Sequence, residues 1–511
     1  MERTSDEILA SLPRRLIDAL ATRVAEAPAA PAIWQGARCW SYAQLAAGIE
    51  AARVRLAAAG VRPGDRVALV IENSVAAVAY VYAVTALDAW AVMINARFTA
   101  REIGIIRTSA GARLAVYSTG DSDAAARHAD EAGAVSEESE HFGAVAIGPA
   151  DPSAVPEPIV ESAEQIGAMI FTSGTTGRPK GAMLSHRALL YQSAIVAERR
   201  AFGPGDCAYV VAPMVHVLGL AGMVLPLLYA GAAMELAARF DPETVLAELR
   251  EGRLTHLYGA APMIAALVGR AGAGTITAPR LKEVLAGGAP IDPALRDTAA
   301  RVFGMALGTG YAATEFTPIS ASTPANPSNP GAVGRPWHGM DFRLVDEAGD
   351  EVPQGEVGEV WCRGPNAMSG YYRDPDATAA IMRPGGWIAI GDLARLDEDG
   401  QIHLVGRLKD LIIRSGFNVY PAEVEGVLTG HSDVLIAAVV GRPVEGNEEV
   451  IAFVEPIPDH TLDTDDLATF AAERLAPYKK PARIVVLECV PVGPTGKIDK
   501  VALRERAAAL D

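Results

Sequence analysis

Residues 61–95 decide the fold: they read VRPGDRVALVI at 61–71, an alanine-rich run VAAVAYVYAVTAL at 75–87, and AVMIN at 91–95. Two short apolar stretches flank a longer one that Asp88 closes, which predicts a strand, a buried helix and a second strand. Strands without alternating polar residues are typical of a parallel sheet that helices cover on both faces. Short apolar strands recur along the chain at 114–117, 144–147, 207–212, 232–236 and 256–258. The pattern therefore predicts the α/β class.

Outward from this stretch, the chain divides into parts of different character. Residues 14–60 predict two amphipathic helices around a short strand, and residues 118–163, rich in Ala, Glu, Asp and Ser, predict a poorly packed connector. From about residue 335, short strands alternate with turns that contain Asp and Gly. The last ~100 residues predict strand, helix, strand, helix and strand, which is long enough for a domain. We therefore expect a large N-terminal domain of helix-covered parallel sheets with a β-rich subdomain at 1–407, and a small α+β domain at 408–511.

The composition excludes several classes of protein. Half of the 511 residues are hydrophobic and 21% are charged, which argues against disorder. The net charge of −17 does not suit general binding to nucleic acid or to an anionic membrane. The four cysteines form no CxxC pair, so they indicate neither a disulfide framework nor a zinc site, and they fit a reducing cytoplasm.

One apolar stretch has the length of a membrane span. Residues 217–234 carry no charge, but they contain three glycines and Pro226, and charged residues follow closely. We expect a buried helix there rather than a membrane helix. The first ten residues show no basic segment followed by an apolar core, so we expect no targeting segment at the start and no stable membrane insertion.

The strongest local signal follows the apolar run 168–170 and reads FTSGTTGRPKG at 171–181. Glycines let backbone N–H groups point into one concavity, and the hydroxyls add further donors, which is an arrangement that binds phosphate. The spacing does not satisfy the Gly-x4-Gly-Lys pattern of a Walker A loop. A flexible surface loop is the alternative for this segment taken alone.

This loop resembles the signature of the adenylate-forming superfamily, which includes acyl-CoA and aryl-CoA synthetases, peptide-synthetase adenylation domains and beetle luciferases. Six further segments resemble motifs of the same superfamily in the same order: PMVHVLGL at 213–220, AGGAP at 286–290, GYAATE at 310–315, GWIAIGD at 386–392, GRLKD at 406–410 continuing as SGFNVYPAEVE at 415–425, and PTGKIDK at 494–500. Two positions depart from the usual motifs. Ala312 replaces a glycine, which we expect to narrow the acyl tunnel, and Ile390 replaces a threonine near the nucleotide.

The resemblance implies a reaction in two steps. A carboxylate first attacks the α-phosphorus of ATP to give an acyl-adenylate and pyrophosphate, and a thiol then attacks the acyl carbon and releases AMP. The first step brings an anion onto a polyanion, so it depends on positive charge and positioning. The catalytic residues implied are Lys497, whose ammonium would sit between the carboxylate and the α-phosphate, Glu315, which would bind Mg²⁺, and His216, which would gate the acyl pocket.

The resemblance also implies the remaining binding residues. Asp392 would accept hydrogen bonds from the ribose, Arg407 would reinforce this contact, and Tyr311 would stack on adenine. Lys409 would be the hinge about which a mobile C-terminal domain rotates between the two steps. The full set implied for ATP or AMP is Thr172, Ser173, Gly174, Thr175, Thr176, Gly177, Lys180, Gly288, Ala289, Pro290, Tyr311, Ala312, Thr314, Asp392 and Arg407. The acyl pocket would be lined by His216, Val217, Leu218, Tyr258, Gly287, Gly310 and Thr317, and CoA would contact Ser415, Gly416, Tyr478 and Lys480.

Several alternatives stay open on the sequence. The apolar pocket residues favour an aromatic or medium-chain aliphatic acid, and His216 argues against an α-amino acid, because amino-acid adenylation domains carry Asp at this place. A separate carrier protein could replace CoA as the acceptor. A non-catalytic ATP- or acyl-sensing protein and a luciferase are further readings, and a homodimer is possible. Six of the seven lysines fall inside the motifs or the basic turn at 478–481, and the seventh is Lys282.

Overall fold

The computed structural model describes residues 3–172, 179–272, 274–287, 291–415, 417–444, 447–492 and 498–510. The chain divides into two compact units, and each is described by itself. The large unit comprises Met1–Phe342, Cys362–Ile390 and Gly400–Ile402, and the small unit comprises Arg343–Trp361, Gly391–Asp399 and His403–Asp511.

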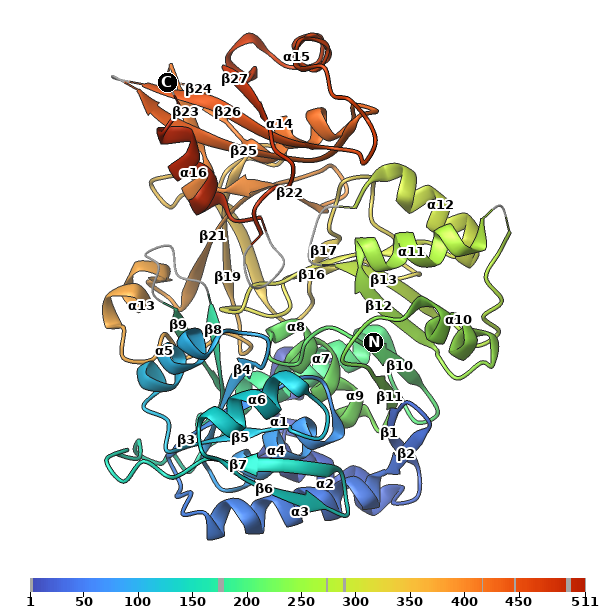
Figure 1. Cartoon of the computed structure of the whole chain (residues 1–511), viewed down its shortest axis with the longest axis vertical. Helices are drawn as coiled ribbons and strands as arrows, with labels where there is room; N and C mark the ends of the chain where they lie inside the picture. The colour runs from blue at the N-terminus through green and yellow to red at the C-terminus, as the bar shows by residue number, and fades with distance from the viewer. Residues whose placement is uncertain are drawn as a thin grey trace. The chain divides into compact units, whose positions relative to one another are not determined.

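Strands β3 and β4, which lie within residues 61–95, are at the centre of a seven-stranded sheet in the large unit (Figure 1). The strand order is β6-β7-β5-β3-β4-β8-β9; the inner strands β5, β3, β4 and β8 are parallel, and β7 and β9 are antiparallel to their neighbours. The bounds are β3 Arg66–Ile71, β4 Trp90–Asn95, β5 Leu114–Tyr117, β6 Val135–Ser139, β7 Gly143–Ile147, β8 Ile166–Thr172 and β9 Lys180–Ser185.

Helices cover both faces of this sheet, as predicted. Helix α4 (Val75–Ala86) is buried at every position from 75 to 85 because it packs against β3 and β4 on one side and against α2 (Leu16–Glu26) and α3 (Tyr42–Ala58) on the other. Helices α5 (Ala100–Ala110) and α6 (Asp123–Glu131) pack on a core formed with β3, β4 and β5. Every residue of β3 is buried, which explains the unbroken apolar run from Val67 to Ile71.

A second seven-stranded sheet completes the large unit's α/β part, in the order β14-β13-β12-β10-β11-β1-β2. All neighbours are parallel except the β1–β2 hairpin, so the single strand predicted within 14–60 is a hairpin. Its strands are β1 Pro31–Gln35, β2 Arg38–Ser41, β10 Cys207–Val210, β11 Ala233–Leu236, β12 His256–Ala260, β13 Glu283–Gly287 and β14 Leu307–Gly308. Other helices of the large unit are α1 Ser5–Ser11, α7 His186–Arg200, α10 Pro242–Arg250, α11 Ala261–Ala271, α12 Pro293–Phe303 and α13 Pro375–Ile381.

The prediction of a poorly packed connector at 118–163 was wrong for its first half. Residues 123–147 form α6, β6 and β7; β7 pairs with β5, and α6 buries Ala125 and Ala129 against the first sheet. The two alanines are four residues apart and form a narrow apolar stripe on the helix. Overall composition hid this stripe because the exposed positions of the segment are strongly polar.

The apolar stretch at 217–234, for which we expected a buried helix, contains a series of helical turns. Residues 217–230 form α8 (Val217–Gly219), the π-helix η1 (Leu220–Val224) and α9 (Leu225–Ala230), and Gly231 ends α9 in the left-handed conformation. Within the described residues, no helix has both the length and the apolar character that crossing a membrane requires.

A β-rich part follows in the sequence, as predicted. Strands β15 (Gly310–Tyr311), β16 (Ser320–Ala321) and β17 (Arg335–Pro336) form a small antiparallel sheet. The chain passes between the two units within strands of another sheet, whose order is β18-β19-β21-β20 with β22 beside β21. These strands are β18 Asp341–Val345, β19 Gly358–Arg363, β20 Met382–Arg383, β21 Trp387–Leu396 and β22 Ile402–Arg407.

The small unit contains an α+β core made from the last hundred or so residues. Strands β25 and β26 are antiparallel, β27 is parallel to β26, and β23 and β24 form a hairpin. Helices α14 and α15 pack on one core cluster and α16 on a second. The bounds are η2 Leu408–Asp410, β23 Ile412–Arg414, β24 Phe417–Val419, α14 Pro421–Thr429, β25 Val434–Val444, β26 Asn447–Pro456, α15 Thr464–Ala472, η3 Pro477–Lys479, β27 Arg483–Val486 and α16 Lys500–Ala508.

Candidate active site

The candidate site of the large unit is built on the carboxyl ends of parallel strands, where ligands bind in open α/β sheets. Thr172 is the last residue of β8 and Lys180 the first of β9, and the two are direct partners in the antiparallel register. These residues therefore flank the glycine- and hydroxyl-rich loop. The loop positions 173–178, including the predicted residues Ser173, Gly174, Thr175, Thr176 and Gly177, lie outside the described residues.

Glu315 and Lys180 are brought together by a residue that the sequence analysis did not select. The Tyr371 hydroxyl donates a hydrogen bond to Glu315 Oε1 at 2.6 Å, and the Lys180 ammonium lies 5.3 Å from the centroid of the Tyr371 ring. Tyr371 is only 8% exposed, and burial, together with the Glu315 carboxylate, raises the pKa of its hydroxyl well above the ordinary value. The hydroxyl therefore stays a hydrogen-bond donor at neutral pH.

His216 lies at the start of the helical stretch 217–230. Its N–H donates to the Pro213 carbonyl and its own carbonyl accepts from Leu220 N–H, both at 3.0 Å. Gly219 packs against the turn before His216 so closely that a Cβ there would lie 2.3 Å from the Pro213 carbonyl oxygen. This contact explains the glycine in the PxxHxxGL pattern. Of the predicted pocket residues that follow, Val217 is buried and Leu218 is 42% exposed.

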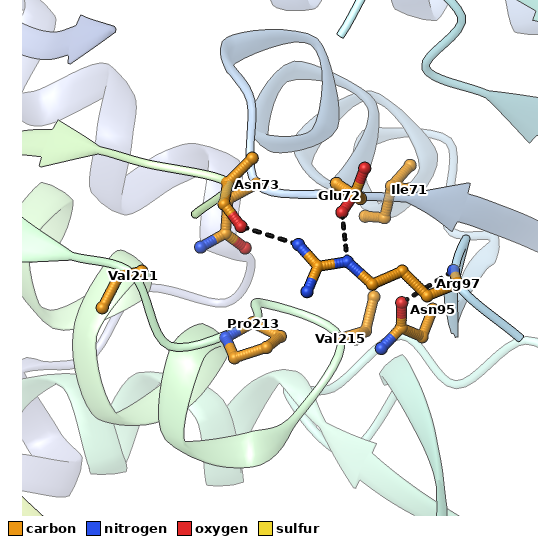
Figure 2. A pocket seen from close by; sticks show the side chains of 9 residues that line it. Ile71, Glu72, Asn73, Asn95, Arg97, Val211, Pro213 and Val215 are labelled. Carbon is orange, nitrogen blue, oxygen red and sulfur yellow. Dashed lines mark hydrogen bonds and ion pairs between the residues drawn. The ribbon is translucent and has the colours of Figure 1, made fainter. Parts of the chain in front are cut away.

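Asn73 ties the His216 segment to the first sheet. Its side-chain amide donates to the carbonyls of Ala212 and Ala237 at 3.0 and 3.1 Å, and its carbonyl oxygen accepts from Met214 N–H at 2.8 Å. Figure 2 shows Asn73 above Pro213 in a small pocket, with the Arg97 guanidinium directed toward Glu72. The pocket draws residues from the ends of β3, β4 and β10, so the carboxyl ends of both large sheets meet beside His216.

The other predicted pocket and adenine residues occupy neighbouring strand ends. Tyr311 and Gly310 form β15, and Tyr311 is buried. Thr317 is buried and donates to the Ala313 carbonyl, Thr314 is half-buried, and Gly287 ends β13.

Ala312 is exposed. The narrowing of the acyl tunnel that we expected from its methyl group stays a prediction.

Tyr258 is engaged in a buried polar cluster. Its hydroxyl donates to Glu283 Oε2 at 2.5 Å, and the other oxygen of Glu283 pairs with Arg200. Burial, together with the Glu283 carboxylate, keeps the pKa of this hydroxyl well above its ordinary value, although the Arg200 charge acts in the opposite direction. The place of Tyr258 in the acyl pocket stays a prediction.

The predicted ribose residues pair within the small unit. Arg407 Nε lies 3.1 Å from Asp392 Oδ1, and Asp392 is 7% exposed on β21. Lys409, the predicted hinge, follows in η2, and loss of solvent contact followed by the Arg407 charge lowers the pKa of its ammonium. Ile390, the departure from the threonine of the motif, is half-buried on the same strand, two residues before Asp392.

The residues predicted to contact CoA also lie in the small unit. The rings of Phe417 and Tyr478 stack with their centroids 4.7 Å apart and an angle of 23° between their planes. Lys479 pairs with Glu423 at 2.6 Å, whereas Lys480 forms no ion pair within the described residues. Ser415 has a positive φ of 53°, and its N–H donates to Asn447 Oδ1 at 2.6 Å. Phe417, more than half exposed, is a residue that motif reasoning missed.

Five further predicted residues lie outside the described residues: Gly288, Ala289, Pro290, Gly416 and Lys497. Their roles stay predictions.

Magnesium fits the chemistry of Glu315. Among the described residues, Oε1 of this carboxylate accepts from Tyr371 and no residue donates to Oε2, which leaves one hard oxygen for a cation. No cluster of three or more His, Cys, Asp or Glu side chains in the described ranges could hold a metal by itself. Mg²⁺ commonly uses one or two carboxylates together with substrate phosphates, so a single glutamate is compatible with it.

Comparison with known protein families decides the class. The description "AMP-binding enzyme" matches residues 20–372, and "AMP-binding enzyme C-terminal domain" matches residues 423–497. The chain belongs to the AMP-binding enzyme family. The superfamily resemblance and the α/β fold class with a small α+β domain are confirmed, and the chain is an AMP-forming acid–thiol ligase.

Individual relatives cover almost the whole chain. A feruloyl-CoA synthase from Amycolatopsis sp. is 35% identical over 491 residues, which is 95% of this chain and 97% of that one. The fatty acid–[acyl-carrier-protein] ligase ScoC from Streptomyces coeruleorubidus is 32% identical over 511 residues, with 94% of each chain covered. The crystal structure of ATP-bound MatB from Rhodopseudomonas palustris is similar with a TM-score of 0.85 at 30% identity, covering 97% of this chain and 99% of MatB.

Proposed function

We propose that this enzyme is an acid–CoA ligase that converts an aromatic or medium-chain aliphatic acid to its acyl-adenylate and then to its CoA thioester. The main observation behind this proposal is that Lys180 and Glu315 both contact Tyr371, next to the loop that we expect to bind phosphate. A cation and a carboxylate held side by side suit ATP bound with a divalent metal. The 35% identity to feruloyl-CoA synthase supports CoA as the acceptor and an aromatic acid.

Different residues of the chain have different roles in adenylation. Lys180 neutralises phosphate charge, and Lys497 places a compact ammonium beside the attacking carboxylate and the α-phosphate. Glu315 would hold Mg²⁺, which supplies charge neutralisation at the phosphates. Asp392 accepts hydrogen bonds from the ribose, with Arg407 paired beside it. Tyr311 provides the flat ring for adenine.

The acid enters an apolar site next to His216. Val217 and Leu218 begin the helical stretch after His216, and neither carries a charge that would recognise a second carboxylate or an α-ammonium. An apolar pocket distinguishes acids that differ by a methylene only by ~1–3 kcal/mol, so we expect several related acids to be accepted.

Thiolation follows in our proposal with Tyr478 and Lys480 contacting CoA. The stacked Phe417–Tyr478 pair offers an aromatic surface, and Lys480 offers an ammonium without an acidic partner among the described residues. Lys409 is the hinge of a rotation of the C-terminal domain, with the domain boundary at 407/408. A cytoplasmic location and a homodimer complete the proposal.

A second candidate acceptor is a separate carrier protein. The 32% identity to a fatty acid–[acyl-carrier-protein] ligase over nearly the full chain favours it. The two candidates share the adenylation step and differ only in the thiol.

A panel of acids assayed with each acceptor tests both candidates. Aromatic acids, beginning with ferulate, and aliphatic acids of graded length are incubated with ATP and Mg²⁺, and AMP and thioester are measured with CoA or with a phosphopantetheinyl carrier. We expect AMP and acyl-CoA in equal amounts with aromatic or medium-chain acids. Thioester on the carrier alone would favour the second candidate, and AMP without any thioester would contradict both.

A further inference from the structure

Residues 367–372 form a strap between two parts of the candidate ATP site. On one side, Met183 N–H donates to the Gly370 carbonyl at 2.9 Å and Tyr372 N–H donates to the Gly181 carbonyl at 2.8 Å. These contacts hold the strap against β9, the strand that begins at Lys180. On the other side, Met368 N–H donates to the Glu315 carbonyl at 3.0 Å. The strap therefore fixes Lys180 and Glu315 relative to each other within the large unit.

The Tyr371 side chain repeats this connection. Its hydroxyl donates to Glu315 Oε1 at 2.6 Å, and its ring lies 5.3 Å from the Lys180 ammonium. The side chain is buried, and Tyr371 N–H donates to the Thr378 hydroxyl at 2.9 Å, so the ring has a defined position. A phenol hydroxyl has one hydrogen to donate, and here Glu315 receives it.

We propose that Tyr371 is a positioning residue for metal-bound ATP: its hydroxyl fixes the Glu315 carboxylate with the second oxygen available to Mg²⁺, and its ring holds the Lys180 ammonium beside it. This inference rests on the proposed function, because it deepens the role given there to Glu315 and Lys180. Tyr371 itself contacts neither reacting atom and acts through its two partners.

The physical effect expected is on orientation. A carboxylate that ligates a metal through one oxygen can rotate unless the other oxygen is held, and partners of this kind are typically worth 10- to 100-fold in metal affinity. The ring contributes separately, because an ammonium within about 6 Å of an aromatic centroid is attracted to its face. The hydroxyl and the ring can therefore be tested by different substitutions.

Tyr371→Phe tests the hydroxyl because it keeps the ring. Mn²⁺, which reports on its own binding by electron paramagnetic resonance, is titrated into the protein with a non-hydrolysable ATP analogue and without acid or CoA. We expect Mn²⁺ affinity 10- to 100-fold lower than in the unsubstituted enzyme. Tyr372→Phe is the matched control, since the neighbouring hydroxyl donates instead to Glu157 at 2.5 Å, and we expect it to bind Mn²⁺ unchanged.

Two further variants establish the route of the effect. Because Tyr371 acts through Glu315, Tyr371→Phe added to Glu315→Gln should weaken Mn²⁺ binding no further than Glu315→Gln alone. Tyr371→Leu also removes the ring, and we expect weaker binding of the metal-free ATP analogue in this variant than in Tyr371→Phe.

The outcomes separate this inference from the proposed function. Unchanged Mn²⁺ affinity in Tyr371→Phe, an equal loss in Tyr372→Phe, or additive losses with Glu315→Gln would each overturn the inference. The titration uses no acid, so it stands even if the acid panel yields no thioester. If the unsubstituted enzyme forms thioester and Tyr371→Phe binds Mn²⁺ normally, the proposed function stands and the positioning role of Tyr371 is overturned.

Discussion

At the scale of single residues, Lys497 carries the strongest functional prediction. An ammonium between two anions lowers the cost of bringing the acid to ATP, and this charge is needed only in the first step. We expect Lys497→Ala to reduce acid-dependent pyrophosphate exchange by at least ~100-fold, in the range known for loss of one preorganised electrostatic contact. Thiolation of preformed acyl-AMP should fall far less. Equal losses in the two half-reactions would contradict this role.

Glu235 predicts a pH dependence of stability away from the site. It is 3% exposed on β11, and burial, followed by the charge of Glu248, raises the pKa of its carboxyl to about 7. Arg253 Nη1, 3.4 Å away, offsets this only in part. The folded protein therefore keeps a proton that the unfolded chain releases near pH 4.5, so this contribution is complete below pH 4.5 and is lost as the pH rises through 7.

Glu235→Gln removes the titration while keeping the shape of the side chain. Between pH 5 and pH 8, we expect the unfolding free energy of the unsubstituted protein to fall by about 2 kcal/mol relative to Glu235→Gln, after allowance for solvent screening. Urea unfolding at several pH values measures this difference. Glu251→Gln is the control, because that side chain is 64% exposed beside the same arginine. A common pH slope for Glu235→Gln and the unsubstituted protein would refute the assignment.

At the scale of elements, the segment 211–230 shows how packing fixes the backbone that carries His216, the proposed gate of the acyl pocket. Gly219 closes the first helical turn after His216 against the carbonyls of Ala212 and Pro213, at distances that no Cβ tolerates. Asn73 holds the residues just before this turn through two hydrogen bonds, one to the Ala212 carbonyl and one from Met214 N–H, and it donates a third to the Ala237 carbonyl. The π-helix that follows fits the general tendency of such turns to occur near functional sites.

Gly219→Ala should therefore displace His216. Overpacking typically costs ~1–3 kcal/mol, and we expect a lower melting temperature and at least a tenfold loss of kcat/KM for the acid in adenylation. Gly222→Ala, three residues later, is the matched control. Its added Cβ would make one close contact, 3.2 Å from Leu218 Cδ1, which is the end of a side chain. Normal kinetics in Gly219→Ala would show that the turn does not position His216.

Much of the fold could be predicted from periodicity, because β3 and α4 are buried on all sides and their sequences contain almost no polar residue. Helix α6 could not, since only two of its alanines, Ala125 and Ala129, are buried and its other positions carry little apolar signal. Motifs located Glu315 and Lys180, whereas Tyr371 and Phe417 were missed. The contacts that single out these two residues join segments distant in sequence, and no local pattern contains such contacts.

At the scale of the whole molecule, the negative net charge opposes the binding of anionic substrates. The net charge is −17, yet ATP and CoA are polyanions, so the long-range field of the protein repels both. The few lysines divide by partner: Lys282, Lys479 and Lys500 pair with acidic groups at 2.6 Å, while Lys180 faces an aromatic ring. Binding must therefore rely on short-range contacts that act against the field.

Salt should separate these two effects. Raising the ionic strength from about 10 to 100 mM shortens the screening length from about 30 to 10 Å, which weakens the long-range repulsion more than a direct ammonium–phosphate contact. We therefore expect kcat/KM for CoA to rise over this range in the unsubstituted enzyme. Lys480→Ala should lower kcat/KM severalfold at every salt concentration and keep the upward slope.

Lys479→Ala is the matched control for this experiment. Both substitutions make the net charge one unit more negative, so the distant field changes equally, but Lys479 is already paired with Glu423. We expect a much smaller loss in Lys479→Ala than in Lys480→Ala. If kcat/KM instead falls with salt, and the fall disappears in Lys480→Ala, the local contact outweighs the field and the acidic surface does not govern the approach of CoA.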